Sequence, residues 1–227
     1  MYDLDNTCQG FSFQAYVPGP DGRPIPAPDG VGFAAAEDTF LEKLNWMLRG
    51  RPDLIELLSC LDTPLDVRIH CGTGFFDEDG HVYLYGRVTD EGDGLVLEIA
   101  TDEVREGGRD GHDVLDVVIH EMTHVLDMIG EDDDPGLLPW WSAEQRALFV
   151  RLREAEKPAI ADGRSAIDRY ALTSDMEFLA VTVETFFVLP AELKKTSPGL
   201  YDLLADYFVV DAQQEAATLA MMSPVVV

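Results

Sequence analysis

The chain has 227 residues, of which 46% are hydrophobic, so it is long enough to bury a substantial core as one domain. Its 43 acidic and 16 basic residues give a formal charge of −27, which repels phosphate backbones and anionic lipid headgroups. This charge argues against a nucleic-acid-binding protein and against a protein of membrane surfaces. No run approaches 18 apolar residues, so the sequence predicts no transmembrane helix.

The N-terminus and the cysteines indicate a cellular compartment. The first residues, MYDLDNTCQGFSF, have neither a basic n-region nor an apolar h-region, so we do not expect a signal peptide. The three cysteines, Cys8, Cys60 and Cys71, follow no disulfide or metal-finger spacing. We therefore expect reduced thiols and a cytoplasmic protein.

The beginning of the chain is expected to be irregular. Residues 14–32 carry five prolines and four glycines between short apolar pieces, which predicts an extended arm or loop and no regular element. We therefore interpret residues 1–33 as a Pro/Gly-rich N-terminal arm. The whole chain, residues 1–227, is expected to form a single domain that carries this arm.

Helices and strands are expected after the arm. Thr39 and Glu42 fit a capping box at the start of a first helix, and Pro52 suits the first turn of a second helix. Runs rich in Val, Ile, Leu and Tyr predict strands at 65–70, 81–89 and 94–100. Later helices are expected at 112–129, 142–156 (capped by Ser142 and Gln145), 175–189 and 198–220. Strands that come early and helices that come late predict an α+β fold around one small sheet.

The segment VVIHEMTHVLDM, from Val117 to Met128, contains an HExxH motif. With five histidines and 17 glutamates, a chain of this length is expected to contain the motif by chance only about 0.008 times. On a helix, His120, His124 and Asp127 fall within about 60° of one another, and aliphatic residues fall on the opposite side. The segment therefore predicts a helix with a polar stripe on one face.

Zinc binding explains this stripe. Two histidines at positions i and i+4 lie one turn apart and can both reach an ion at about 2.0–2.1 Å. Glu121, rotated by about 100°, can reach a metal-bound water as a general base without ligating the metal. The alternative is a set of exposed or hydrogen-bonded polar residues without a metal. Asp127 either accepts a hydrogen bond that orients a ligating histidine or is a solvated charge.

A catalytic zinc site usually has a third protein ligand. Glu177 and Glu184 lie seven residues apart on an otherwise apolar predicted helix, where a carboxylate pair is costly to bury without a cation. Ser174 and Glu177 also fit a capping box, so residue spacing leaves both glutamates open as the ligand. Three other histidines have no partner at a recognisable spacing and are expected to be structural or exposed. These are His70, His81 and His112.

Three segments resemble the zinc peptidases of the Mlc titration factor A family, which are related to the catalytic domain of anthrax lethal factor. They are HEMTHVLDM, DRYALTSDMEFLAVTVETFFVLPAEL and SPGLYDLLADYF, and the resemblance covers residues 115–210. The family pairs HExxH with a Tyr–Ala segment and a glutamate seven residues after the tyrosine, which is the spacing from Tyr170 to Glu177. The resemblance implies a zincin-like α+β fold, with a small mixed sheet on the active-site helix and a mostly helical C-terminal half.

The resemblance also implies roles for particular residues. The implied ligands of one zinc ion, a gluzincin-like set, are His120, His124 and Glu177. Glu121 is implied as the general base, and the Tyr170 hydroxyl is implied to stabilise the oxyanion of the reaction. Glu184 is then expected to orient a metal ligand without contacting the ion itself. The strand at 94–103 is expected either to bind the substrate as an added strand or to be an ordinary strand of the sheet.

These features predict a zinc-dependent peptidase whose partner is a peptide or protein substrate. The alternative is a non-catalytic regulatory protein of the same fold that sequesters a protein partner. The retained Glu121 favours hydrolysis, because a purely structural metal site needs no base. In the family a transcriptional repressor serves as binding partner. Met122 and Thr123 replace the family's common Phe–Ala pair, so that particular partner is not carried over to this chain.

Overall fold

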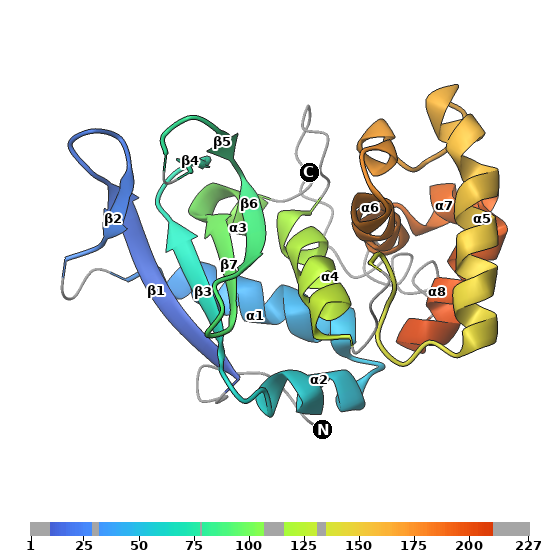
Figure 1. The fold of residues 1–227 in the computed structure, drawn as a ribbon, viewed down its shortest axis with the longest axis horizontal. Coiled ribbons are helices and arrows are strands. Elements are labelled where there is room, and N and C mark those ends of the chain that lie inside the picture. The colour runs from blue at the N-terminus through green and yellow to red at the C-terminus, as the bar shows by residue number, and fades with distance from the viewer. Residues whose placement is uncertain (1–9, 29–31, 78, 107–115, 131–134, 211–227) are drawn as a thin grey trace, which may run out of the picture. The chain divides into compact units, whose positions relative to one another are not determined.

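The computed structural model describes residues 10–28, 32–77, 79–106, 116–130 and 135–210 (Figure 1). It confirms the α+β fold class, with a small mixed sheet and a largely helical second half. The chain divides into two compact units, residues 1–126 and 127–227. The division falls inside one continuous helix, α4 (Val117–Ile129).

The first unit is built around a five-stranded sheet with the strand order β2-β1-β3-β7-β6 (Figure 1). Its strands are β1 (Phe11–Pro18), β2 (Pro24–Pro26), β3 (Leu65–His70), β6 (Gly86–Asp90) and β7 (Leu95–Ala100). The central strands β1, β3 and β7 run parallel, and β2 and β6 pair antiparallel at the two edges. A separate hairpin consists of β4 (Phe75–Phe76) and β5 (Tyr83–Leu84).

The register gives the sheet one apolar and one polar face. In the parallel strands, Val67 is paired with Phe13 on one side and with Leu97 on the other, so alternate apolar residues share a face. The ring of Phe40 packs edge-on against Phe11 and Phe13, which places helix α1 on this face. The sheet therefore buries one face under helices, as the alternation of apolar residues requires.

The polar face carries a buried ionic cluster. Nε2 of His70 lies 2.9 Å from Oε1 of Glu98, and Arg87 binds the other carboxylate oxygen. Burial raises the pKa of the Glu98 carboxyl, but the hydrogen bonds from His70 and Arg87 outweigh burial and hold that pKa below its ordinary value. His70 is 3% exposed, which confirms the expectation that it is a structural residue.

The helices of the first unit lie near their predicted positions, but the predicted N-terminal cap of the first one is wrong. They are α1 (Ala34–Leu48), α2 (Pro52–Ser59), α3 (Thr101–Glu106) and the first part of α4. Helix α2 begins at Pro52 as predicted. The Thr39 capping box is wrong, because α1 begins five residues earlier and the Thr39 hydroxyl donates to the Ala35 carbonyl. The apolar residues that α1 buries begin with Ala36, so packing placed the helix start before the capping signal.

The second unit is helical. Its elements are α5 (Ala143–Ala161), η1 (Arg169–Leu172), α6 (Asp175–Val188), α7 (Pro190–Thr196) and α8 (Pro198–Phe208). The capping box of Ser142 and Gln145 is confirmed by hydrogen bonds in both directions. Helix α6 matches the expected 175–189 within one residue. The expected last helix begins at Pro198 as predicted, but its extension to 220 is wrong, because α8 ends at Phe208 and Val209 adopts a left-handed conformation with φ +55°. Residues 211–220 lie outside the described residues.

Two expectations for the first unit are wrong. The arm contains β1 and β2, and β1 pairs with β3 along six residues, so this segment is an integral part of the sheet. The expected strand at 81–89 is two strands, because β5 turns back on β4 and β6 pairs with β7. Both errors concern strand pairing, which depends on partners distant in the sequence.

Two of the three cysteines lie in the described part of the chain. Cys60 and Cys71 are free and exposed, in agreement with the absence of a disulfide framework, and Cys8 lies outside the described residues. Among the helices in the described ranges, none combines the length and apolar character needed to cross a membrane. The single-domain organisation of residues 1–227 stays a prediction.

Candidate metal centre

The HExxH motif lies on helix α4, whose N-terminal end is held by side-chain contacts. The Asp116 carboxylate accepts hydrogen bonds from the amides of Val118 and Ile119 at 3.1 and 3.3 Å, which caps the helix. Nζ of Lys43 lies 2.8 Å from the same carboxylate and connects the helix start to α1. All residues from Val117 to Leu126 are buried, including the motif residues. The predicted start at 112 is wrong, because the helix begins at Val117 behind the Asp116 cap; residues 112–115 themselves lie outside the described residues.

The two histidines of the motif direct the same ring nitrogens toward one point. Nε2 of His120 and Nε2 of His124 are 3.2 Å apart, and their side chains come from residues only 4% and 8% exposed. Two nitrogens that each lie about 2.0–2.1 Å from one tetrahedral ion are separated by roughly 3.3 Å. The observed separation therefore fits two ligands of a single zinc ion.

Glu121 lies beside the sheet's edge strand. A Cβ atom built on Gly86, the first residue of β6, would lie 2.7 Å from Oε1 of Glu121 and 2.7 Å from Val117. Glycine at this position therefore leaves the space that the carboxylate occupies. Glu121 is 6% exposed, so its carboxylate is confined between α4 and β6. Sequence reasoning missed Gly86, because only the strand's approach to α4 shows its role.

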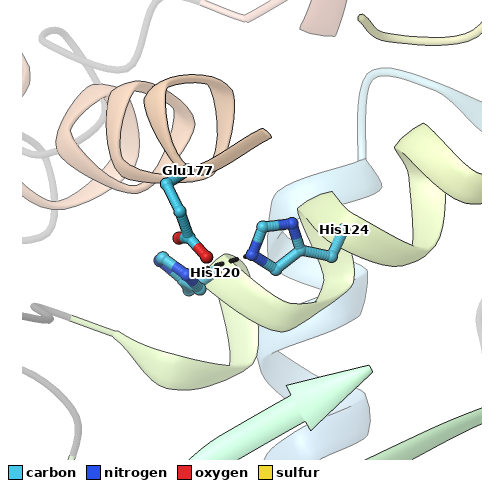
Figure 2. A group of neighbouring side chains, drawn as sticks. All are labelled: His120, His124 and Glu177. Carbon is cyan, nitrogen blue, oxygen red and sulfur yellow. Dashed lines mark hydrogen bonds between the residues drawn. The ribbon is translucent and has the colours of Figure 1, made fainter. Parts of the chain in front are cut away.

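Glu177 is the third residue that could hold a metal. One ligating atom each of His120, His124 and Glu177 lie within 4.8 Å of one another, and Figure 2 shows the Glu177 carboxylate directed toward the imidazoles. The Ser174 hydroxyl accepts from the Glu177 amide at 3.1 Å. This cap of α6 is made by the main-chain amide of Glu177 and not by its side chain.

Two further residues expected at the site, Tyr170 and Glu184, lie on η1 and α6. The Asp168 carboxylate caps η1 by accepting from the Tyr170 amide at 2.7 Å, and Tyr170 is 40% exposed. Glu184 is 1% exposed in the middle of α6. Among the described residues, the group of possible ligands contains neither His70 nor Glu184. His81 is exposed, as expected, and His112 is outside the described residues.

Asp127 has a role that the spacing could not indicate. Its carboxylate accepts hydrogen bonds from the backbone amides of Gly136, at 2.9 Å, and of Leu137, at 3.0 Å. It therefore anchors the backbone of Gly136 and Leu137 to the end of α4. A further role in orienting a histidine stays a prediction.

The strand expected to bind substrate is not available for pairing. Strand β7 is paired with β3 through Val96–Ala100 and with β6 through Leu95–Ile99, so both of its edges are occupied. The prediction that 94–103 accepts an added strand is wrong. Strand β6 lies at the edge of the sheet, next to the Glu121 helix.

Two histidines one helical turn apart and a glutamate within ligating reach are a donor set typical of zinc metallopeptidases. The chain belongs to the glucose-regulated metallo-peptidase M90 family, whose model matches residues 70–209. Mlc titration factor A of Escherichia fergusonii is 30% identical over 109 residues, which are 44% of this chain and 41% of the relative. The protein of the same name from Salmonella arizonae is 27% identical over 105 residues, 43% of this chain and 41% of the relative.

The matched region spans about two fifths of the length of these relatives. The comparisons confirm the family expected from the three sequence segments. The family membership shows a metallopeptidase relationship, and the relatives carry the name of a regulator.

Proposed function

We propose that this chain is a zinc-dependent peptidase that holds one zinc ion with His120, His124 and Glu177. The observation that carries the proposal is the convergence of their ligating atoms within 4.8 Å, with the imidazole nitrogens 3.2 Å apart. Two neutral imidazoles and one carboxylate are a frequent donor set of catalytic zinc, which leaves one position open. When bound, zinc would polarise the scissile carbonyl and make water more acidic.

The residues of the chain would carry the proton and the developing charge. Glu121 would accept a proton from the attacking water and pass it to the nitrogen of the leaving amine. Its place against Gly86, confined by the edge strand, supports this role because the carboxylate cannot swing freely. The Tyr170 hydroxyl, on a partly exposed side chain, would donate a hydrogen bond to the oxyanion at the scissile carbonyl. Glu184, buried on the same helix as Glu177, would orient a metal ligand without binding the ion itself.

A peptide substrate would bind beside Glu121 as an added strand on β6. In the described part of the chain, β6 pairs with β7 on one side and is the last strand of its sheet. Backbone hydrogen bonds to such an edge place a peptide without strong demands on its side chains. Residues 1–227 would form a single peptidase domain.

Chelation tests this function. Purified protein is expected to cleave an unfolded protein such as casein, to lose this activity when a chelator removes the metal, and to regain it with added zinc. The products are followed by mass spectrometry. Cleavage that continues at full rate in metal-free protein would exclude the proposed chemistry.

The alternative is a regulatory protein that sequesters a partner without cleaving it. The relatives' name, Mlc titration factor A, favours this function for those proteins. Zinc-loaded protein that binds its partner tightly but cleaves neither the partner nor unfolded substrates would support the alternative.

Gly86→Ala tests the placement of Glu121. We expect kcat for peptide cleavage to fall by about tenfold to a hundredfold, because the new methyl displaces the carboxylate and small misplacements are costly. Zinc content is expected to stay unchanged, since the substitution does not touch the ligands. Gly32→Ala is the matched control, because no atom lies within 4 Å of its added Cβ. Unchanged kcat in Gly86→Ala would show that the position of Glu121 does not limit the reaction.

A further inference from the structure

We infer that Asp127 and Gly136 form a clamp that sets the position of Glu177 on α6. They would thereby act as positioning residues for the third metal ligand, and the inference rests on the metal site proposed above. All the contacts that carry it lie within the second compact unit.

The first half of the clamp begins on α4. Asp127 lies three residues after His124 on the same helix, and both of its carboxylate oxygens are 2.9 Å from the Gly136 amide. Oδ1 also accepts from the Leu137 amide at 3.0 Å. Hydrogen bonds to a charged acceptor are stronger than those between neutral groups. Leu137 and Leu138 are buried, which keeps this segment from moving away from its anchor.

The second half of the clamp touches the backbone that carries Glu177. Gly136 has a φ of +81°, a conformation that glycine adopts readily. A Cβ added there would lie 2.5 Å from the carbonyl oxygen of Asp175 and 3.2 Å from the amide nitrogen of Met176. These two residues immediately precede Glu177. Gly136 therefore packs backbone against backbone at the start of α6, with no room for a side chain.

Other contacts hold the same helix end from α5. Nη2 of Arg153 lies 2.9 Å from the Asp175 carboxylate, and Nζ of Lys157 lies 3.5 Å from it. The Ser174 hydroxyl caps the Glu177 amide. The two ion pairs fix α6 against α5, whereas the Asp127–Gly136 contacts connect it to α4, the helix that carries both histidines. The clamp thus sets the one ligand that lies outside the HExxH helix.

Zinc affinity is the readout that separates this role from ordinary stabilisation. Gly136→Ala would push the start of α6 away, and Asp127→Ala would release the segment. Each is expected to weaken zinc binding about tenfold to a hundredfold, the range found for groups that orient metal ligands. Asp127→Asn keeps one acceptor oxygen but places an NH2 group where Oδ2 accepts from the Gly136 amide, so it is expected to weaken zinc binding less than Asp127→Ala does.

The experiment measures zinc dissociation constants by competition with a chromophoric chelator, together with thermal unfolding. Gly163→Ala is the matched control, because Gly163 also has a positive φ, +69°, but its nearest neighbour is a side-chain atom 3.9 Å away. It should lose stability from the same backbone strain, without the steric clash, and keep its zinc affinity. Asp127→Ala gives an independent result if Gly136→Ala does not fold.

A coupling test decides whether the clamp acts through Glu177. In a Glu177→Ala background, adding Gly136→Ala should weaken zinc binding no further. Equal losses in both backgrounds would overturn the inference, as would Gly136→Ala and Asp127→Ala proteins that bind zinc like Gly163→Ala. These results leave the proposed site intact if wild type binds zinc. Wild-type protein that binds no zinc removes the proposed site and the clamp together.

Discussion

Glu121→Gln is expected to lower kcat for peptide hydrolysis by about a thousandfold, with one zinc ion still bound. A positioned general base contributes about 10²–10⁴-fold to such reactions, and glutamine cannot accept the proton. Glutamine has nearly the same shape as glutamate, so it fits the confined space against Gly86 without disturbing α4. The measurement is kcat on a defined peptide, combined with metal analysis of the same sample.

The zinc content is the control for this experiment. Loss of activity together with zinc would indicate damage to the site and would say nothing of a base. Activity near that of wild type in the zinc-loaded Glu121→Gln protein would contradict the proposed role of Glu121. The substitution is expected to leave binding of a protein partner unchanged, so it separates hydrolysis from sequestration of a partner.

Glu177→Ala is expected to weaken zinc binding by more than about a hundredfold, while Glu184→Gln weakens it by about a hundredfold at most. A directly ligating carboxylate contributes more than a group that supports a ligand, for which losses of about 10–100-fold are usual. A carboxylate oxygen of Glu177 lies within 4.8 Å of the histidine ligand atoms. Glu184 is a buried residue of α6, 1% exposed, and is not in that group. Both proteins are compared by chelator competition.

Glu192→Ala is the matched control for this pair, because Glu192 is an exposed glutamate on the neighbouring helix α7. It removes the same charge from the same unit and is expected to leave zinc affinity unchanged. Zinc retained in Glu177→Ala but lost in Glu184→Gln would reverse the assignment of the third ligand. Glutamine at 184 keeps the buried volume, which limits loss of stability in that variant.

The sequence predicted the helical parts of the candidate site well, since they depend on local signals. The HExxH spacing placed His120 and His124 on one face of α4, and Ser142 with Gln145 marked the start of α5. A helix fixes the relation of residues three and four apart, so such spacing carries geometric information. The choice between Glu177 and Glu184 needed the resemblance, because both lie on one face of α6.

The features that sequence reasoning missed depend on contacts between distant segments. Strand β1 lies in a segment rich in proline and glycine, yet its pairing with β3 gives it a place inside the sheet. The edge position of β6 follows from the strand order, which the alternation of apolar residues does not determine. Gly86 and Gly136 owe their roles to close backbone approaches, and neither position carries a local signal for them.

The zinc content of the purified chain tests the central claim most directly. Wild-type protein prepared in zinc-containing buffer and then freed of loosely bound metal should contain one zinc ion per chain by mass spectrometry. His124→Ala protein, which loses one of the two nitrogens that lie 3.2 Å apart, should contain almost none. Wild-type protein without zinc, or His124→Ala protein with a full equivalent, would contradict the proposed metal site.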